Sequence, residues 1–231
     1  KRNNDNMNPV KHVAVIMDGN GRWGLKYKKS RNLGHKAGLN VVEKIIKHTI
    51  RKKINYLTLY VFSTENWKRP KKEINFLFYL LEDFLIKKTK DLVTQGIKLR
   101  IIGNKKPFSK KLIKILDNSE DATKNNKILQ LNLALNYGSK AELINTMNVI
   151  LKKKIPFTET NLNKHLYTKD SPDPDLLIRT GDTNRLSNFL LWQNAYSEIY
   201  FIKKLWPDFT TKDYNAILLK FKKTKRNFGD I

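Results

Sequence analysis

Six short apolar segments are spaced along the chain, and each predicts a β-strand. They are rich in β-branched, leucine and aromatic residues. The first is apolar at every position, which is typical of a strand that is buried on both faces. The predicted strands cover residues 13–17, 56–62, 97–102, 128–136, 176–178 and 198–201.

Between these segments, apolar residues recur three and four positions apart, which is the spacing of one helix face. A further helix is expected to begin at Ser139, with Glu142 completing a capping box. The other predicted helices cover residues 39–49, 70–96, 109–123, 161–167, 187–195 and 214–221.

Strands that alternate with helices predict the α/β class. We expect a single domain with a six-stranded, mostly parallel sheet, helices on both faces and an apolar tunnel. A chain of 231 residues is within the usual size of one domain. We expect residues 1–10 to form a flexible tail and residues 11–231 to form the domain.

Polar residues follow several predicted strands directly. The run Asp18-Gly19-Asn20-Gly21-Arg22 follows the first strand, residues 63–69 follow the second, and Arg179 follows the fifth. In open parallel sheets ligands bind beyond the carboxyl ends of the strands, so we expect these groups to gather at one edge. Glycine amides and guanidinium groups suit phosphate oxygens, and a carboxylate suits Mg²⁺. The alternative at Asp18 is an ordinary turn after a buried strand.

The chain carries a net charge of +25, which could indicate a nucleic acid or an anionic membrane surface as a partner. The lysines come in scattered pairs, which favours solvated faces, and we expect no nucleic-acid partner. Arginine is used differently, because it clusters in the predicted loops beyond strand ends, where its two-pronged geometry suits phosphate. These arginines are Arg22, Arg31, Arg69, Arg179 and Arg185.

Several classes of protein lack support in the sequence. There is no cysteine, so disulfides and thiolate metal sites are excluded. The longest apolar run, residues 76–81, is far shorter than the roughly 20 residues that span a bilayer. Residues 1–6 are polar and do not match a secretory signal, so we expect a cytoplasmic protein. The glycine-rich signatures of nucleotide hydrolysis and of dinucleotide binding are also absent.

The predicted helix over residues 70–96 is apolar on nearly every side between Ile74 and Ile86. Such a helix is buried in the core, lines an apolar cavity or forms a subunit contact, and plain core is the simplest interpretation. An apolar helix beside an arginine-rich edge suggests a diphosphate that carries an apolar tail.

Five blocks of the sequence resemble the signature blocks of the cis-prenyltransferase family. The similarity runs from Lys11 to Gly229 in the family's order and spacing. The blocks are residues 18–23, Gly34-His35, residues 62–67 with Arg69, Arg179-Thr180-Gly181, and residues 185–193.

The resemblance implies an enzyme that joins an allylic diphosphate, usually farnesyl diphosphate, to successive isopentenyl diphosphates with cis double bonds. The bacterial members nearest in pattern imply undecaprenyl diphosphate, used for the cell-wall lipid carrier, as the product. The resemblance further implies Mg²⁺ as the cofactor and a homodimer as the assembly. The basic surface suggests peripheral contact with the anionic inner face of a membrane.

The family's functional residues carry over onto matching positions. Asp18 would be the essential carboxylate and hold Mg²⁺, and Glu198 would be a second metal ligand, given by the partner subunit or a neighbouring loop. Asn66, with Ser63, would lie where the isopentenyl carbon loses its proton, with Phe62 and Trp67 covering the reacting end. The allylic diphosphate would be bound by Gly19, Asn20, Gly21, Arg22, Arg31 and His35. The isopentenyl diphosphate would be bound by Arg69, Arg179, Arg185 and Ser187. The remaining substrate-binding residues would be Trp23, Thr64, Glu65, Trp67 and Leu186.

Two departures from the family pattern affect these roles. Asn184 stands where relatives often carry a histidine, so no imidazole reaches the metal from this position. The family's Arg-x-Gly tail appears as Asn227-Phe228-Gly229, which leaves Arg226, one place early, as the substitute.

Three alternatives stay open. The product length could differ, since bulk at Val61 and Leu135 near the expected tunnel would shorten it. A non-catalytic partner subunit is the second, although Asp18 and Asn66 are intact. A basic nucleic-acid-binding protein is the third, and it would require a clustered stripe of charge.

Overall fold

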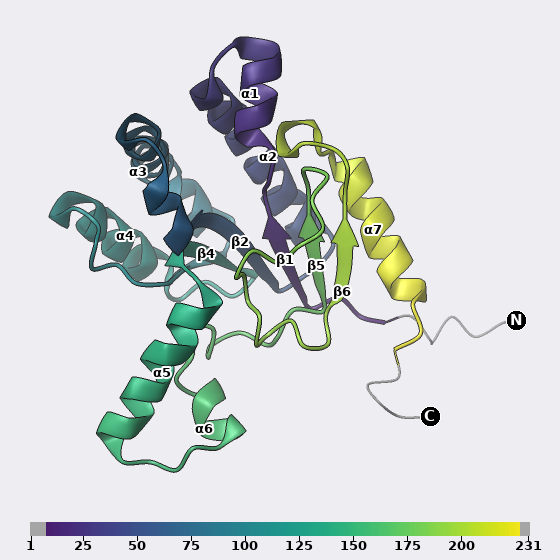
Figure 1. Cartoon of the computed structure of the whole chain (residues 1–231). Helices are drawn as coiled ribbons and strands as arrows, with labels where there is room; N and C mark the ends of the chain where they lie inside the picture. Colours follow the sequence, from purple (N-terminus) through teal and green to yellow (C-terminus); the bar gives the residue numbers. More distant parts are fainter. Residues whose placement is uncertain (1–7, 227–231) are drawn as a thin grey trace, which may run out of the picture.

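The computed structural model describes residues 8–226 and folds them around one sheet (Figure 1). Its strands are β1 (His12–Ile16), β2 (Tyr56–Ser63), β3 (Ile97–Ile102), β4 (Leu129–Tyr137), β5 (Leu176–Arg179) and β6 (Glu198–Phe201). The strand order is β3-β4-β2-β1-β5-β6, and all neighbouring strands are parallel. The predicted α/β class and the six strands are confirmed.

Seven α-helices and two 3₁₀-helices lie within the described range. They are α1 (Asn20–Lys28), α2 (Arg31–Arg51), η1 (Thr64–Lys68), α3 (Lys71–Thr94), α4 (Lys110–Thr123), α5 (Ser139–Lys153), α6 (Glu159–Asn163), η2 (Trp206–Asp208) and α7 (Thr211–Lys223). Residues 1–7 of the predicted tail lie outside the described residues. Asn8 donates its main-chain N–H to the carbonyl oxygen of Lys222 at 3.3 Å.

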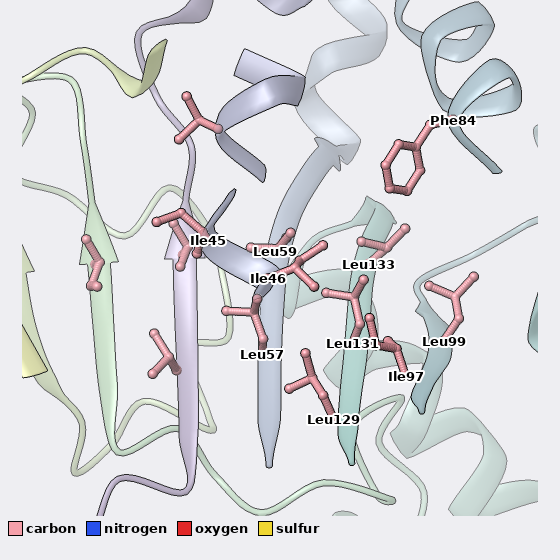
Figure 2. Close-up of a cluster of buried hydrophobic side chains, with 14 of the residues drawn as sticks. Ile45, Ile46, Leu57, Leu59, Phe84, Ile97, Leu99, Leu129, Leu131 and Leu133 are labelled. Atoms are coloured by element: carbon pink, nitrogen blue, oxygen red, sulfur yellow. The ribbon is translucent and has the colours of Figure 1, made fainter. Parts of the chain in front are cut away.

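The main hydrophobic core lies between one face of the sheet and helices α2, α3, α4 and α7. Figure 2 shows Leu57 and Leu59 of β2 beside Leu129, Leu131 and Leu133 of β4. These are every second residue of their strands, because alternate side chains of a strand point to the same face. Leu129, Leu131 and Leu133 therefore share the face of β4 that packs against the helices. Each such side chain stabilises the fold by about 1.5–3 kcal/mol when it is fully buried.

The opposite face of the sheet is covered by the segment that precedes β6. Phe189 from this segment is fully buried and stacks on Tyr60 of β2, with 4.3 Å between ring centroids. Ala14 and Ile16 of β1 belong to the same cluster. Helices α5 and α6 share a separate small cluster around Ile150. The second layer is therefore built from irregular chain as well as from helices.

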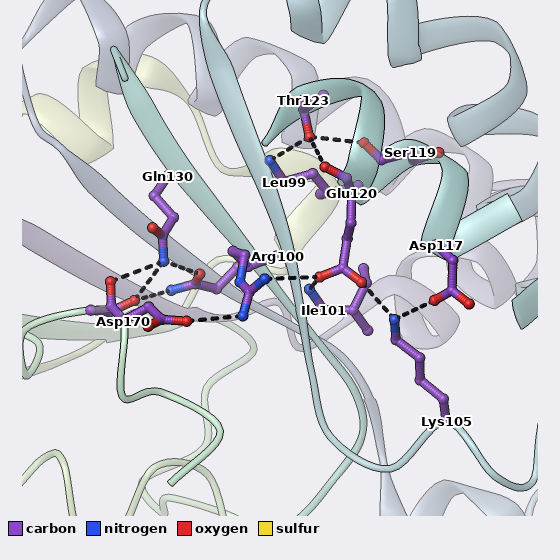
Figure 3. A network of polar contacts seen from close by, with 12 residues as sticks. Leu99, Arg100, Ile101, Lys105, Asp117, Ser119, Glu120, Thr123, Gln130 and Asp170 are labelled. Carbon is purple, nitrogen blue, oxygen red and sulfur yellow. Dashed lines mark hydrogen bonds and ion pairs between the residues drawn. The ribbon is translucent and has the colours of Figure 1, made fainter. Parts of the chain in front are cut away.

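Helix α4 protects the free edge of the sheet at β3. The Thr123 hydroxyl oxygen accepts the N–H of Leu99 at 3.0 Å, and the Glu120 carboxylate accepts that of Ile101 at 2.9 Å (Figure 3). Arg100 of the same strand lies 3.9 Å from the Glu120 carboxylate. An edge strand with unpaired N–H groups is a template for aggregation, and here helix side chains pair with two of them.

Helix α1 is a feature that the sequence analysis missed. Gly19-Asn20-Gly21 has the local character of a turn, because glycine disfavours helix interiors. Tertiary packing overrides that preference. A Cβ at Gly24 would lie 2.2 Å from the carbonyl oxygen of Ser30 and 2.7 Å from the nitrogen of Gly34. Glycine thus permits the close approach of α1 and α2.

The helix predicted over residues 187–195 is wrong. Ser187, Asn188 and Leu190 have positive φ values of 49°, 62° and 47°, and these left-handed conformations cannot continue a right-handed helix. The segment forms turns that bury Phe189 and Leu190 against the sheet. The apolar residues that gave the helical spacing are in fact core residues of a loop.

The predicted capping box at Ser139 is also wrong. Gly138 is the N-cap of α5, and Ser139 is its first residue. The Glu142 carboxylate is buried, accepts the N–H of Tyr167 at 2.8 Å and pairs with the Tyr137 hydroxyl. Partners from distant segments therefore replace the local capping bond.

Candidate functional site

Asp18 and Arg179 meet where the order of the strands reverses. The chain passes from β1 to β2 on one side, whereas β5 lies on the other side of β1. The connections that leave β1 and β5 diverge at this point, and such switch points leave a crevice in open α/β sheets. Arg179 Nη2 lies 2.9 Å from Asp18 Oδ2. The predicted gathering of polar groups at this edge is confirmed for this pair.

A cavity of about 370 Å³ opens beside Asp18 and Arg179. Its polar part is lined by predicted site residues, namely Asp18, Asn20, His35, Ser63, Asn66, Arg69, Arg179, Arg185 and Ser187. Its apolar part is lined by side chains of α2, α3, β2 and β4, namely Leu39, Val42, Leu59, Val61, Leu77, Leu80, Leu81, Phe84 and Leu133. One cavity thus joins an arginine-rich mouth to an apolar interior.

Helix α3 supplies one wall of this cavity. Leu77, Leu80, Leu81 and Phe84 of α3 line it, whereas Ile86 is 64 % exposed. Of the interpretations left open for residues 74–86, cavity lining therefore holds for one side of the helix. Core packing holds for the buried Ile74 and Leu85, and Tyr79 and Ile86 face outward.

The N-terminus of α1 adds main-chain donors to the same edge. Gly19 is the N-cap with φ of 112°, a conformation that favours glycine because it has no Cβ. The N–H groups of Asn20, Gly21 and Arg22 occupy the first turn, where a helix has no carbonyl partners for them. The helix dipole concentrates positive potential at this end. The arrangement is suited to binding an anion.

The Asp18 carboxylate lies between two guanidinium groups. Arg22 Nη2 is 3.2 Å from Oδ1, while Arg179 holds Oδ2. Arg22 Nη2 also donates to the carbonyl oxygen of Gly181 at 2.6 Å. The Asp18 side chain keeps 29 % exposure, so its carboxylate remains accessible to a further ligand.

Arg179 is 4 % exposed and ties the loop after β5 to the site. Its Nη1 donates to the Ser187 hydroxyl and to the carbonyl oxygen of Arg185, both at 2.6 Å. Its Nε is buried and has no hydrogen-bond partner among residues 8–226. Tyr60, another residue of the cavity lining, donates to the carbonyl oxygens of Tyr137 and Ser187.

Glu73 is the functional residue that the sequence analysis missed. It lies in the first turn of α3, is 7 % exposed and contacts three predicted substrate-binding residues. Arg31 donates from Nε to Oε2 at 2.9 Å, while Arg69 Nη1 and His35 Nε2 each lie 3.2 Å from Oε1. In the sequence, an acidic residue three positions after Pro70 looks like an ordinary first-turn residue of a helix. Its role becomes visible only in the structure, where it contacts the predicted arginines.

The electrostatics of this cluster follow from burial and charge. Burial raises the pKa of the Glu73 carboxyl, but the hydrogen bonds and positive charges of Arg31 and Arg69 outweigh burial and hold it below its ordinary value. Burial lowers the pKa of His35, and the hydrogen bond to Glu73 offsets this only in part. At neutral pH the cluster therefore contains one carboxylate, two guanidinium groups and a neutral imidazole.

The 3₁₀-helix η1 presents Asn66 to the cavity. The Asn66 side-chain oxygen accepts the main-chain N–H of Ser63 at 3.0 Å, and the two residues form a reciprocal capping box. Trp67 donates to the Asn136 side chain at 2.8 Å and packs edge-to-face on Phe62. Phe62 of β2 and Trp67 of η1 do not line the cavity.

Other predicted site residues do not line the cavity. Trp23 donates to Asp208 at 2.7 Å, Glu65 accepts from Asn188 at 3.0 Å, and Leu186 packs against the second face of the sheet. The full set outside the lining is Gly19, Gly21, Arg22, Trp23, Arg31, Thr64, Glu65, Trp67, Leu186 and Glu198.

Glu198 lies at the opposite end of the sheet from Asp18. It begins β6 and pairs in register with Leu176, whereas Arg179 at the end of β5 pairs with Phe201. Arg226 is near it, 4.0 Å from the Glu198 carboxylate and 3.6 Å from that of Asp175. The expectation that a neighbouring loop of the same chain brings Glu198 to Asp18 is corrected, because parallel strands separate their first and last residues.

The described chain holds no group of three or more histidine, aspartate or glutamate side chains that could bind a metal ion. Asp18 is the one carboxylate among the residues that line the cavity. Mg²⁺ needs only one or two protein carboxylates when phosphate oxygens and water complete its shell. The donor set at Asp18 therefore fits magnesium bound together with a phosphate ligand. No helix within residues 8–226 is long and apolar enough to cross a membrane.

Comparisons with known proteins agree with this geometry. The prenyltransferase model of the undecaprenyl diphosphate synthase family matches residues 16–229. An isoprenyl transferase of Thermotoga maritima is 44 % identical over 225 residues, covering 95 % of this chain and 97 % of its own. One from Neisseria meningitidis serogroup B is 42 % identical over 220 residues, covering 95 % of this chain and 89 % of its own.

Solved structures show the same fold. Lavandulyl diphosphate synthase from Lavandula x intermedia, in complex with dimethylallyl diphosphate, superposes with a TM-score of 0.91 at 33 % identity and covers 96 % of this chain and 98 % of its own. A probable undecaprenyl diphosphate synthase from Campylobacter jejuni superposes with a TM-score of 0.83 at 36 % identity, covering 96 % and 100 %. The chain belongs to the undecaprenyl diphosphate synthase family of prenyltransferases.

Proposed function

We propose that this protein is a Mg²⁺-dependent cis-prenyltransferase. It condenses farnesyl diphosphate with successive isopentenyl diphosphates and yields undecaprenyl diphosphate. The observation that carries the proposal is the single cavity that joins the arginine-rich mouth at Asp18 to an apolar interior walled by α3. A diphosphate with a growing hydrocarbon chain matches both halves of that cavity.

The allylic diphosphate binds at the N-terminus of α1. The N–H groups of Asn20, Gly21 and Arg22 and the positive end of the helix dipole attract its oxygens. Arg31 and His35 at the start of α2 complete this subsite. The hydrocarbon tail then extends between α2 and α3, along the side chains of Leu39 and Leu77.

The isopentenyl diphosphate binds to Arg69, Arg179, Arg185 and Ser187. Arg179 already touches Ser187 and the Arg185 carbonyl, so these groups form one unit. The Nε of Arg179 is buried and has no hydrogen-bond partner among residues 8–226. Asn66 lies on the same cavity wall and is positioned to assist loss of the proton from the isopentenyl unit.

The chemistry follows from where these groups sit. Ionisation of the allylic carbon–oxygen bond leaves negative charge on the departing diphosphate, and donors placed there lower the barrier. Asp18 would hold Mg²⁺, which would neutralise part of that charge. Fixing both substrates in one cavity supplies orientation. Asp18 and Asn66 both line the cavity, which argues against a non-catalytic partner subunit.

Product length depends on the apolar end of the cavity. Val61 and Leu133 line it, whereas Leu135 is buried in the core outside the lining. Substitution of Val61 by a larger residue is therefore expected to shorten the product, and substitution of Leu135 is not.

The experiment is chain elongation with purified protein. Farnesyl diphosphate and radiolabelled isopentenyl diphosphate are supplied with Mg²⁺ or with EDTA, and the extracted lipids are sized. The proposal expects products up to about eleven isoprene units in Mg²⁺ and none in EDTA, with cis double bonds by NMR. A shorter series would correct the product, and the absence of product with any allylic primer would overturn the activity.

We propose that the protein works as a homodimer in which Glu198 reaches the partner's metal site. Apolar residues are exposed on the edge strand β6, at Ile199 and Phe201, and on one side of α5, at Ile144, Met147 and Leu151. Exposed apolar groups on an edge strand are typical of interaction surfaces.

A mixing experiment tests this arrangement. Asp18→Ala and Glu198→Ala protomers are each inactive under the proposal, but a mixed dimer has one intact site. Unfolding and refolding the two together should restore up to about a quarter of wild-type activity by random pairing. No restoration, or a monomer by sedimentation, would refute the shared site.

We further propose that the protein is cytoplasmic and that its basic surface contacts anionic lipid, because the net charge is +25. Sedimentation with vesicles that contain or lack anionic lipid tests this. Equal binding to both would refute an electrostatic contact.

A further inference from the structure

We propose that Glu73 is a positioning residue that holds the cations of both diphosphate subsites in one arrangement. This inference rests on the proposed function, since it takes Arg31 and His35 as allylic-side groups and Arg69 as an isopentenyl-side group. Glu73 itself does not line the cavity, so it acts through these three side chains.

The three side chains that contact Glu73 come from two different segments of the chain. Arg31 and His35 belong to α2, whereas Arg69 lies between η1 and α3. Arg31 uses two nitrogens, with Nε 2.9 Å from Oε2 and Nη2 3.3 Å from Oε1. Arg69 and His35 share Oε1 at 3.2 Å each. One carboxylate thus fixes three donors that would otherwise repel or move apart.

The arrangement leaves donors for a ligand. Arg31 Nη1 and Arg69 Nη2 form no hydrogen bond within residues 8–226, and the two side chains are 44 % and 33 % exposed. The Arg31 guanidinium also packs on Gly21, because a Cβ there would lie 2.6 Å from its Cζ. Glu73 therefore keeps Arg31 against the N-terminal turn of α1, the proposed allylic subsite.

A positioning role and a purely neutralising role predict opposite signs. Removing the negative charge alone would strengthen the attraction of the mouth for anions. Removing a carboxylate that orders the guanidinium groups would weaken diphosphate binding, because binding then has to restore their geometry. The sign of the change in affinity therefore separates the two roles.

The test compares Glu73→Gln with Glu82→Gln as the matched control. Glu82 is on the same helix and pairs with Lys111 outside the cavity. Glu73→Gln is expected to raise the KM of both substrates about tenfold, with a smaller change in kcat, while Glu82→Gln leaves both near wild type. Unchanged or lowered KM values in Glu73→Gln would overturn the proposal.

A double-mutant cycle shows whether Glu73 acts through Arg69. In an Arg69→Gln background, Glu73→Gln is expected to add little further increase in the KM of isopentenyl diphosphate. Additive increases would instead indicate a general structural effect and contradict positioning. Should Glu73→Gln not fold, Glu73→Asp keeps the charge on a shorter side chain and is expected to raise KM less.

Binding of inorganic diphosphate separates this inference from the proposed function. Titration calorimetry needs no turnover, and Glu73→Gln is expected to bind inorganic diphosphate about tenfold more weakly than wild type. If the wild type shows no turnover but binds inorganic diphosphate about tenfold more tightly than Glu73→Gln, only the proposed reaction is refuted. If the wild type turns over its substrates but Glu73→Gln binds inorganic diphosphate as tightly as the wild type or more tightly, only the role of Glu73 is refuted.

Discussion

Two polar clusters lie on the same sheet and differ in how completely they are paired. The site cluster surrounds Asp18, Arg179 and Glu73 beyond the carboxyl ends of the strands. The second, which we term the sheet ladder, crosses the second face and consists of His12, Thr58, Asn132 and Ser171. It joins side chains of β1, β2 and β4 to the segment before β5.

The sheet ladder is neutral and closely paired. His12 contacts the carbonyl oxygen of Pro172 at 2.6 Å and the hydroxyl of Thr58 at 2.7 Å. Asn132 donates to Thr58 at 2.9 Å and to Ser171 at 3.0 Å. Burial lowers the pKa of His12 to about 4, so its ring is uncharged at neutral pH.

The site cluster keeps charges and spare donors instead. Its arginines retain nitrogens without partners in the described chain, and Arg179 keeps a buried one. Buried polar groups are normally satisfied, and leaving one unpaired costs about 1–3 kcal/mol. Closed pairing of the sheet ladder therefore suits a role in stability, whereas spare donors beside a cavity suit the anionic ligand of the proposed function.

The largest expected effect is the loss of activity in Asp18→Asn. The amide keeps the size of the side chain but loses the charge that faces two guanidinium groups and that would hold Mg²⁺ under the proposed function. We expect kcat/KM to fall by at least about a thousandfold, with the thermal midpoint little changed. Steady-state kinetics and calorimetry measure both. Asp117→Asn is the control, since Asp117 pairs with Lys105 outside the cavity.

The next effect concerns the pH dependence of stability through His12. Its pKa is about 4 when folded and 6.5 when unfolded, so the unfolded chain binds the proton more tightly. The contribution of neutral His12 to the free energy of unfolding is complete above about pH 6.5. It is lost as the pH falls to about 4, and the total loss is about 3 kcal/mol. Urea unfolding between pH 7.5 and 4.5 should show a steeper loss in wild type than in His12→Gln. Equal slopes would contradict the assignment.

The smallest effect is expected for Thr58→Val, which removes the hydroxyl that links His12 to Asn132. The shape is kept, but two buried groups each lose a partner, so unfolding free energy should fall by about 2 kcal/mol. KM values should stay at wild type. Urea denaturation measures the unfolding free energy, and steady-state kinetics measure the KM values. A changed KM would show that the two clusters are coupled.

Much of the fold could be predicted because its signals are local. The apolar runs placed all six strands, since short segments rich in β-branched, leucine and aromatic residues are typical of strands. The same reasoning failed at residues 187–195, where helical spacing arose from a loop whose Phe189 and Leu190 pack on the sheet. It also missed α1, whose glycines have a role only against α2.

The sequence by itself determined the α/β class, the strand ends that carry chemistry and the family blocks around Asp18, Asn66 and Arg179. Only the tertiary structure decided that Glu73 joins three predicted binding residues and that Glu198 lies at the far end of the sheet from Asp18. The physical reason is range. Periodicity and motifs report contacts between near neighbours in the chain, whereas a carboxylate that meets Arg31 from 42 residues away is placed by packing alone.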